Sequence, residues 1–298
     1  MRGNESKAME EIFDSALLVR RKLRALRIGD EGAAFLMHRV AEDLAERLAT
    51  VDRRFERAAT LFCVTGDAKA VLHESGKVGD VLRVEADDAF LGAREGVTAR
   101  PETIPLQAAS LDLAVSLLAL QETNDTPGIF AQIRRALKPD GLFLGAMAGS
   151  GTLAELRESM LQAEAEISGG ATPHVHPFAD VRDVGGLLQR AGFALPVTDV
   201  ETITVRYDTI FPLMRDLRAM GATNVLRERS RRPAPRSLFM RAAEIYADRF
   251  SDPDGRIRAT FQIVWFSGWV PHESQQKPLK PGSAEVSLSK ILGKGQPL

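Results

Sequence analysis

The amino-acid sequence predicts an α/β fold, a parallel sheet wound with helices on both faces, and three observations predict it. An almost unbroken apolar run from Leu111 to Leu120 is typical of a strand buried on both faces. Apolar residues at helical spacing follow from Ile129 to Leu137, and a second apolar run covers Leu142 to Met147. Pro139 cannot continue the helix between them, and Gly141 is expected to take the left-handed turn after it. Strand, helix and strand form a βαβ unit, whose crossover is nearly always right-handed.

The composition fits one large globular unit, because the chain has 298 residues and 44% of them are hydrophobic. Its 39 basic and 40 acidic side chains nearly balance, so net charge favours neither nucleic acid nor a membrane. The single cysteine, Cys63, cannot form an internal disulfide and fits a reducing compartment. No apolar run reaches about 18 residues, and the first residues carry acids that a signal or transit peptide lacks. We therefore expect a soluble cytoplasmic protein.

The pattern divides the chain into four zones. Residues 1–56 are expected to hold two amphipathic helices, and residues 57–200 the core of the sheet. Residues 201–270 are expected to hold the last two strands, with a helical lid of about residues 209–258 inserted between them. Residues 271–298 are expected to form an extended tail.

Within the core, three short strands are expected before the central unit, at Ala58 to Val64, Val81 to Val84 and Val97 to Ala99. A helix is expected to begin with Asp180 as its cap and to stop at Gly192. Trp265 and Trp269 alternate with Phe261, which predicts that these side chains belong to the core.

Two clusters of basic residues suggest partners. The first helix carries Arg20, Arg21, Lys22, Arg24 and Arg27. A solvated helix face is the simpler interpretation, and contact with an anionic partner or with lipid headgroups, as in a peripheral membrane protein, is the alternative. The second cluster lacks interleaved aromatic residues, which argues against nucleic acid and leaves an acidic protein partner. It consists of Arg227, Arg229, Arg231, Arg232 and Arg236.

Other motifs carry little chemistry. His174 and His176 lie two residues apart, but a metal needs more than two ligands, so a structural loop is favoured and no metal site is predicted. The chain has no nucleophile triad, no phosphate-binding loop and no dinucleotide-binding glycine motif. No catalytic residue can be named.

Several segments carry a resemblance. The strand and turn LKPDGLFLGAM, with the order of the strands, resemble class I S-adenosylmethionine (SAM) dependent methyltransferases. Five separated segments resemble, in order, the alphaproteobacterial and mitochondrial complex I assembly factor family, which includes a protein arginine hydroxylase and has a sister branch of malonyl-acyl carrier protein methyltransferases. They are GAMAGSGTLAELRESMLQAEAEISGG, PHVHPFADVRDVGGLLQRAGF, MRDLRAMGATN, ATFQIVWFSGW and HESQQKPLKPGSAEVSL. The resemblance implies a Rossmann-like methyltransferase sheet, and SAM as its cofactor.

The resemblance also implies three cofactor-binding residues. Gly66 is the only glycine in TLFCVTGDA, where the family has a glycine-rich turn that lets backbone approach SAM. Glu85 stands where an acid binds the ribose, and Gln121 stands where a His or Gln follows the fourth strand. Glu122 or Asp67 could rebuild a site in another way.

Other family positions are altered. Arg100 replaces the acid that binds the adenine amino group, and the aromatic residue expected after Gln121 is absent. Depending on the register, the acid of the first strand becomes Thr60 or Phe62, and the early glycines become Phe62, Cys63 or Val64. We therefore expect weak SAM binding or none.

Two hypotheses follow from the resemblance. The chain is either a SAM-using enzyme of complex I assembly that modifies a protein side chain beneath the lid, or an inactive scaffold that binds a protein partner without SAM. The altered loop favours the scaffold a little. In both hypotheses the partner is a protein, with a complex I subunit as the first candidate.

Overall fold

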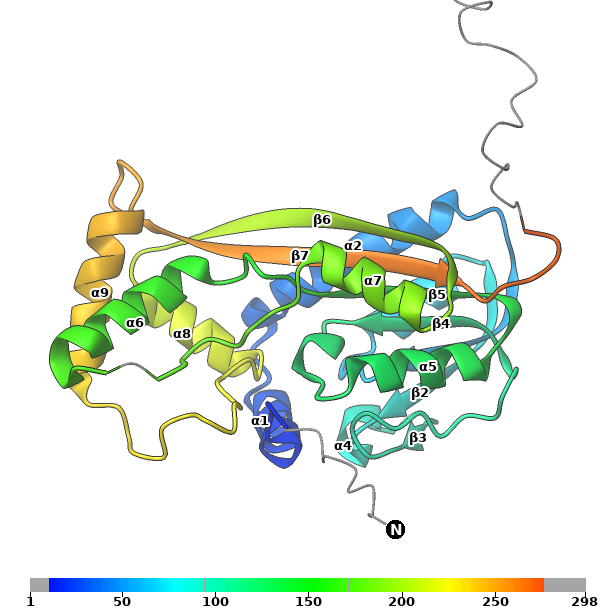
Figure 1. Ribbon diagram of the computed structural model, residues 1–298, viewed down its shortest axis with the longest axis horizontal. Helices are drawn as coiled ribbons and strands as arrows, with labels where there is room; N and C mark the ends of the chain where they lie inside the picture. The colour runs from blue at the N-terminus through cyan, green and yellow to red at the C-terminus, as the bar shows by residue number, and fades with distance from the viewer. Residues whose placement is uncertain (1–10, 94, 171, 276–298) are drawn as a thin grey trace, which may run out of the picture.

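The computed structural model describes residues 11–93, 95–170 and 172–275 (Figure 1). Seven strands of these residues form one sheet in the order β3-β2-β1-β4-β5-β7-β6. Strands β1 to β5 are parallel, whereas β7 runs antiparallel to both β5 and β6. Helices precede the sheet and are inserted between its last two strands, so the predicted fold class is confirmed. The division into four zones stays a prediction.

The elements have the following bounds. The strands are β1 (Phe55–Leu61), β2 (Val78–Glu85), β3 (Val97–Thr98), β4 (Leu111–Leu117), β5 (Leu137–Ala148), β6 (Ala194–Tyr207) and β7 (Ile257–Trp269). The helices are α1 (Ser15–Ile28), α2 (Phe35–Thr50), α3 (Asp67–Glu74), α4 (Asp88–Leu91), α5 (Thr126–Ala136), α6 (Ala154–Ser168), α7 (Val181–Arg190), α8 (Ile210–Ala219) and α9 (Arg236–Phe250). Two short 3₁₀ helices are η1 (Glu31–Ala34) and η2 (Leu120–Glu122).

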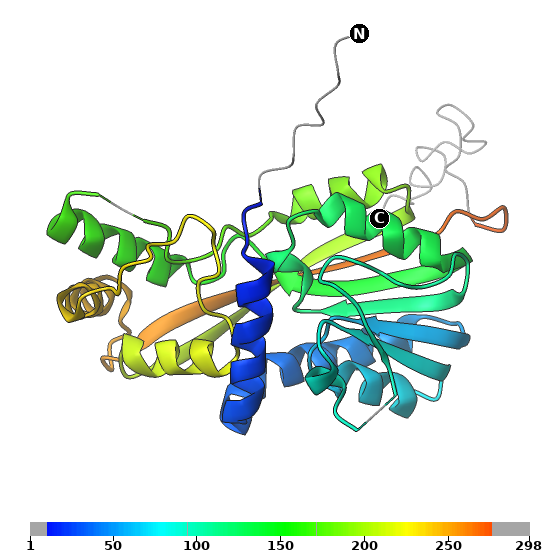
Figure 2. The same ribbon diagram turned by 90° about the horizontal axis from the view of Figure 1, so that it is seen from below.

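Helices cover both faces of the sheet (Figure 2). On one face, Phe130 of α5 and Leu188 of α7 pack in one cluster with Phe143 of β5. On the other face, Leu44 of α2 and Leu72 of α3 close a second cluster. The apolar stripes predicted for these helices therefore bury the sheet on both sides, as the continuous apolar strands require.

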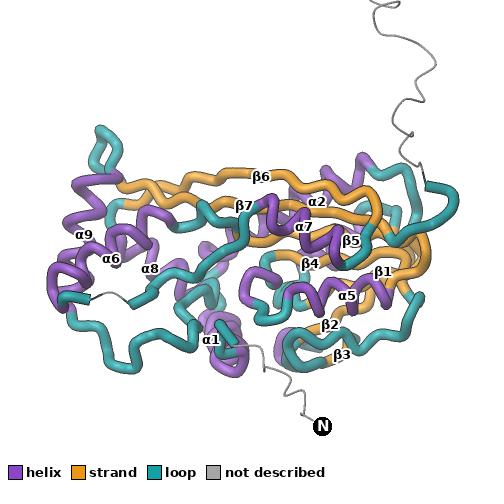
Figure 3. Tube along the Cα trace, viewed as in Figure 1, coloured by secondary structure: helices purple, strands orange, loops and turns teal. Residues whose placement is uncertain are grey.

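Strands β6 and β7 are longer than the rest of the sheet. They pair from Ala194 opposite Trp269 to Tyr207 opposite Ile257, whereas β5 reaches only Ile263 of β7. The remaining two-stranded ribbon extends past the sheet toward α6, α8 and α9 (Figure 3). A third apolar cluster joins the ribbon to these helices and includes the ring of Phe261.

Helix α1 lies between this helical extension and the sheet (Figure 2). Asp14 caps its first turn, and Gly29 ends it in the left-handed conformation expected of a terminal glycine. Just before the helix, Phe13 forms a β-bridge with Leu226 and donates its backbone N–H to Asn124 Oδ1 at 2.8 Å. The segment before α1 thus joins the loop between α8 and α9 to the loop after β4.

The structure corrects the turn after α5. Strand β5 begins at Leu137, directly after the helix, and the left-handed residue is Asp140 with φ 62°, not Gly141. The Asp140 carboxylate accepts hydrogen bonds from Arg53 at 2.7 Å and Gln275 at 2.8 Å, which hold this conformation. Gly141 serves a close approach instead, because a Cβ there would lie 2.9 Å from a backbone oxygen.

The structure also tests the predicted helix cap, the core tryptophan and the start of the first strand. Asp180 caps α7, as predicted, and Trp265 is 1% exposed in the core. Strand β1 begins at Phe55, three residues before the predicted Ala58, because two charged exposed residues hide its start in the sequence. The predicted tail lies outside the described residues from 276 onward. Among the residues described, no helix combines the length and apolar character needed to cross a bilayer.

The core predicts one destabilising substitution. A Cβ on Gly145 would lie 2.3 Å from Cζ of Phe266. That ring cannot move freely, because its centroid lies 5.6 Å from Phe130 and 5.4 Å from Phe143. We expect Gly145→Ala to lower the free energy of unfolding by about 1–3 kcal/mol, measured by urea denaturation.

Gly170→Ala is the matched control, because a Cβ at that exposed glycine meets no atom within 4 Å. Equal stability of the two variants would contradict this account of the core.

Candidate functional site

The three residues assigned to the cofactor lie at or just after the carboxyl ends of β1, β2 and β4. Such ends meet at one edge of a parallel sheet, where α/β proteins bind ligands. Gly66 precedes α3, Glu85 is the last residue of β2, and Gln121 belongs to η2. The structure therefore brings them to one edge, but their side chains do not share one cavity.

The loop after β1 keeps a backbone that glycine would favour. Phe62 has φ 56° and Val64 has φ 63°, although neither is glycine. These are two of the positions at which the resemblance placed the family's glycines. A left-handed conformation costs a residue with a side chain about 1–2 kcal/mol, so other contacts must hold the loop.

Those contacts come from Arg83 and Glu85. The Arg83 guanidinium donates to the backbone oxygens of Val64 at 3.1 Å and Thr65 at 2.9 Å. It also pairs with Glu85 Oε1 at 2.9 Å, while the Val64 N–H donates to Glu85 Oε2 at 3.1 Å. Both carboxylate oxygens of Glu85 are thus engaged by the protein itself.

Glu85 is fully buried, and burial raises the pKa of its carboxyl group against the opposing effect of Arg83. Its carboxylate has no exposed surface through which a ribose could approach, which argues against the predicted ribose contact. Gln121 donates to the backbone oxygen of Leu118 at 2.7 Å and so folds back onto its own loop. Gly66 has φ −87°, which any residue can adopt. Binding of SAM by these residues stays a prediction.

Helix α1 closes the cavity beside Glu85. The remaining space is about 50 Å³ and is lined by Leu18 and Lys22 of α1 together with Phe62, Val64 and Glu85. Pockets for ligands of this size usually measure about 300–1,000 Å³. The residues present therefore do not fit SAM in this conformation.

The closure is fixed by a buried ion pair that the sequence did not reveal. Lys22 Nζ lies 3.1 Å from Glu122 Oε2, and the two side chains are 15% and 5% exposed. Lys22 was interpreted as part of a solvated basic face, and this interpretation is wrong for Lys22, because its charge pairs inside the protein. Glu122 was considered as a substitute cofactor ligand, but one of its oxygens is held by Lys22.

The other oxygen of Glu122 faces His176. His176 Nδ1 lies 3.5 Å from Glu122 Oε1, and His176 Nε2 lies 3.1 Å from the Val225 nitrogen. Because the Val225 N–H can only donate, Nε2 is the unprotonated nitrogen and Nδ1 carries the proton. Burial lowers the pKa of His176, and Glu122 partly opposes the shift. His176 is therefore a structural histidine in the neutral form, and among the described residues no cluster of three or more His, Cys, Asp or Glu could hold a metal ion.

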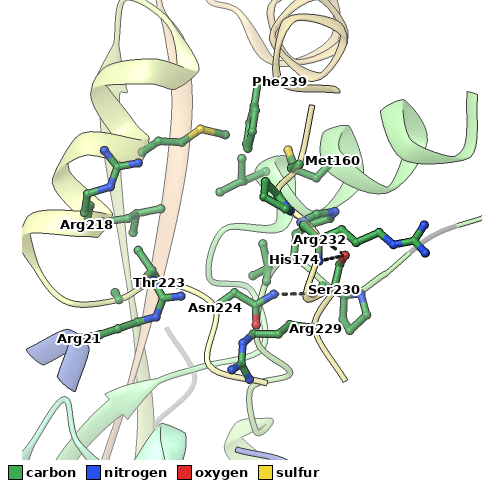
Figure 4. Close-up of a pocket in the computed structure, with 18 of the residues that line it drawn as sticks. Arg21, Met160, His174, Arg218, Thr223, Asn224, Arg229, Ser230, Arg232 and Phe239 are labelled. Atoms are coloured by element: carbon green, nitrogen blue, oxygen red, sulfur yellow. Dashed lines mark hydrogen bonds between the residues drawn. The ribbon is translucent and has the colours of Figure 1, made fainter. Parts of the chain in front are cut away.

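A larger pocket of about 580 Å³ lies between α6, α8 and the loop before α9 (Figure 4). Arg229, Arg231 and Arg232 of the predicted arginine cluster line it, together with Arg21 and Arg218. Arg229 lies 3.3 Å from Asp14, and Arg227 pairs with Glu11, so part of the cluster anchors the segment before α1. The sequence signal for this pocket was the arginine run, but its apolar wall comes from three separate helices.

The left-handed loop predicts an unusual order of stabilities. Val64→Gly and Val64→Ala both remove the side chain, but only glycine relieves the backbone at φ 63°. We expect the glycine variant to be more stable than the alanine variant by about 1 kcal/mol, measured by urea denaturation.

Val81 of β2 is the matched control, because in an ordinary strand glycine is less stable than alanine by about 0.5–1 kcal/mol. The same order at both positions would refute backbone strain at Val64.

His176 predicts a loss of stability in acid. Folding lowers its pKa, so the unfolded chain, with a histidine pKa near 6.5, binds this proton more tightly. The contribution to stability is complete above pH 6.5 and declines as the pH falls from 6.5 toward the folded-state pKa. We expect the free energy of unfolding to fall more steeply between pH 6.5 and about pH 5 in the wild type than in His176→Gln, by up to about 1.4 kcal/mol per pH unit.

Carboxyl groups titrate in both proteins and cancel in that difference. Parallel curves for the two proteins would show that His176 is not neutral in the folded state.

Known proteins resemble this chain along most of its length. A protein of Homo sapiens named arginine-hydroxylase NDUFAF5, mitochondrial, is 37% identical over 298 residues, which are 97% of this chain and 86% of that protein. The protein of the same name in Dictyostelium discoideum is 45% identical over 189 residues, 63% of this chain, and there the match covers 43% of the relative. A malonyl-[acyl-carrier protein] O-methyltransferase of Methylovorus is 33% identical over 81% of this chain and 84% of that protein.

The names of the two arginine-hydroxylases correct one expectation. Both proteins are named as mitochondrial, which contradicts the cytoplasmic location predicted from composition. A lone cysteine fits any reducing compartment, and a balanced charge does not separate one compartment from another.

A family model described as methyltransferase domain matches residues 61–145, from the end of β1 to β5. Two solved bacterial proteins share the fold. YcgJ of Bacillus subtilis has a TM-score of 0.51 and 14% identity, and the match covers 81% of this chain and 99% of YcgJ. A methyltransferase-like protein of Bacillus halodurans has a TM-score of 0.53 and 12% identity, and the match covers 77% of this chain and 98% of that protein. With the long match to the human protein, these findings show that the chain belongs to the class I methyltransferase superfamily, in the complex I assembly factor (protein arginine hydroxylase) family.

Proposed function

We propose that this protein acts in the assembly of respiratory complex I by binding a subunit of that complex, without methyl transfer from SAM. The family to which the chain belongs supports the part in complex I assembly. The absence of methyl transfer is inferred from the cavity beside Glu85, whose volume is about 50 Å³. Lys22 and Arg83 of the chain itself satisfy the two buried carboxylates at this edge of the sheet.

A second candidate function is hydroxylation of an arginine side chain in a protein. The 37% identity to the human arginine-hydroxylase over 97% of the chain favours it. The described residues offer no cofactor site to which this chemistry could be assigned. Mass spectrometry of a complex I subunit, in cells with and without the protein, would detect an oxygen atom added to an arginine.

The proposal predicts no SAM binding. Titration calorimetry of the purified protein with SAM, and with its demethylated product, is expected to give no saturable heat up to millimolar ligand. The reason is the closed cavity, which would have to expand by several hundred Å³, by order of magnitude, to admit a ligand of this size. Saturable binding that Glu85→Ala abolishes would contradict the proposal.

A second arm tests the same proposal in cells that lack the protein. Ala86 lines the remaining space beside Glu85, and Ala86→Leu is designed to fill it. We expect this variant to restore assembled complex I, measured by native gel electrophoresis, as well as the wild type does. Failure of Ala86→Leu, in a protein that unfolds at the wild-type temperature, would show that the cavity must admit a ligand.

A further inference from the structure

The 580 Å³ pocket has an apolar wall. Leu156 and Met160 of α6, Met214 and Leu217 of α8 and Phe239 of α9 contribute to it. Figure 4 shows Met160 and Phe239 together on one side of the pocket and Arg21 and Arg229 on the other. Its volume lies within the range of about 300–1,000 Å³ that is typical of ligand pockets.

The lining of the pocket is also cationic. Arg21, Arg218, Arg231 and Arg232 contribute to it, and within the described part of the chain none of these four belongs to an ion pair. A neighbouring hollow of about 340 Å³ shares Arg21 and Arg218 and adds Arg20 and Arg24. Together with Arg229, which pairs with Asp14, seven arginines thus surround two adjoining hollows, and such a group repels itself unless an anion neutralises it.

Arg21 stands at the centre of this group. Its Nη1 donates to Thr223 Oγ1 at 2.5 Å, while its Nε is buried without a hydrogen-bond partner. Burial, followed by repulsion from Arg229 and Arg24, lowers the pKa of Arg21. An unsatisfied donor on a guanidinium inside a cationic group is the arrangement expected where an acceptor oxygen of a ligand binds.

We propose that this pocket binds a single alkyl chain that ends in an anionic group, a phosphate or a carboxylate. The chain would lie against Met160, Met214 and Phe239, and the anionic group would face Arg21 and Arg218. Arginine suits such a group, because its planar guanidinium donates two parallel hydrogen bonds to phosphate or carboxylate. An acidic peptide would use the arginines but leave the apolar wall uncovered, so the amphipathic ligand accounts for both sides.

The pocket also leads inward. A second cavity of about 120 Å³ shares Leu156, His174 and Leu217 with it and is lined at its inner end by Gln121 and Glu122. The proposed alkyl chain would have this second cavity as the space beyond the apolar wall. The proposed ligand site is nevertheless separate from that cavity, and it does not depend on the function proposed above.

The test is titration calorimetry of the full chain with dodecyl phosphate below its micelle concentration. We expect saturable binding of dodecyl phosphate and at least tenfold weaker binding, by order of magnitude, of both dodecanol and ethyl phosphate, since each lacks one half of the ligand. The double variant Arg231→Ala/Arg232→Ala is expected to weaken binding by about tenfold, because two of the positive charges that line the pocket and attract the anionic group are lost. Both side chains are exposed, so the fold should tolerate the change.

Arg54→Ala/Arg57→Ala is the matched control. It removes the same charge at exposed positions next to the start of β1, at the opposite end of the strand from the cofactor edge, and should bind dodecyl phosphate as the wild type does. Equal losses in the two double variants would overturn the proposal, because only overall charge would then matter. Equal affinity for ethyl phosphate, or displacement by hexaglutamate at similar concentrations, would also overturn it, in favour of a plain anion site or an acidic peptide site. Absence of binding would overturn it outright.

Discussion

The carboxylate of Glu122 connects three parts of the chain. One oxygen pairs with Lys22 of α1, and the other faces His176, whose ring accepts a hydrogen bond from Val225 in the loop before α9. A buried ion pair adds little stability over apolar packing, yet removing one partner typically costs about 3–5 kcal/mol. These contacts therefore fix the positions of three parts relative to one another: α1, the loop after β4 and the helical extension.

A second buried ion pair, between Arg83 and Glu85, holds a loop that has side chains where glycine would suit the backbone. In the loop after β1, Phe62 and Val64 follow a path that suits residues without side chains. Arg83 and Glu85 hold this path by hydrogen bonds to the loop backbone, from both the cation and the carboxylate. Both oxygens of the Glu85 carboxylate are thus used within the protein, and the residue to which the resemblance assigns a ribose contact supports the loop.

Local patterns account for what the sequence could predict. The βαβ unit follows from apolar runs of a few residues, and the ends of α1 and α7 follow from Gly29 and Asp180, which act within one helical turn. Gly141 was assigned the wrong role because Asp140 is held left-handed by Arg53 and Gln275, which lie far away in the chain.

The candidate site was predicted less completely, because it also depends on contacts between residues that lie far apart in the chain. The altered loop after β1 can be recognised from the resemblance, and it led to the expectation of weak SAM binding or none. The partners of Lys22 and Glu85 could not be foreseen, because Lys22 and Glu122 lie far apart in the sequence and meet only in the folded protein. The periodicity of α1 is the same whether Lys22 is solvated or buried. For the arginine pocket, the sequence likewise indicated the run of arginines but not the apolar residues of α6, α8 and α9 that complete it.

The attachment of α1 has a consequence for synthesis of the protein. The side chain of Arg21 bonds to Thr223, 202 residues later in the chain. Ribosomes add about 5–20 residues per second, so α1 waits roughly 10–40 s before its final neighbours exist. During that time α1 is a basic amphipathic helix that an anionic surface can bind. The order of translation therefore decides when α1 can dock against the rest of the protein.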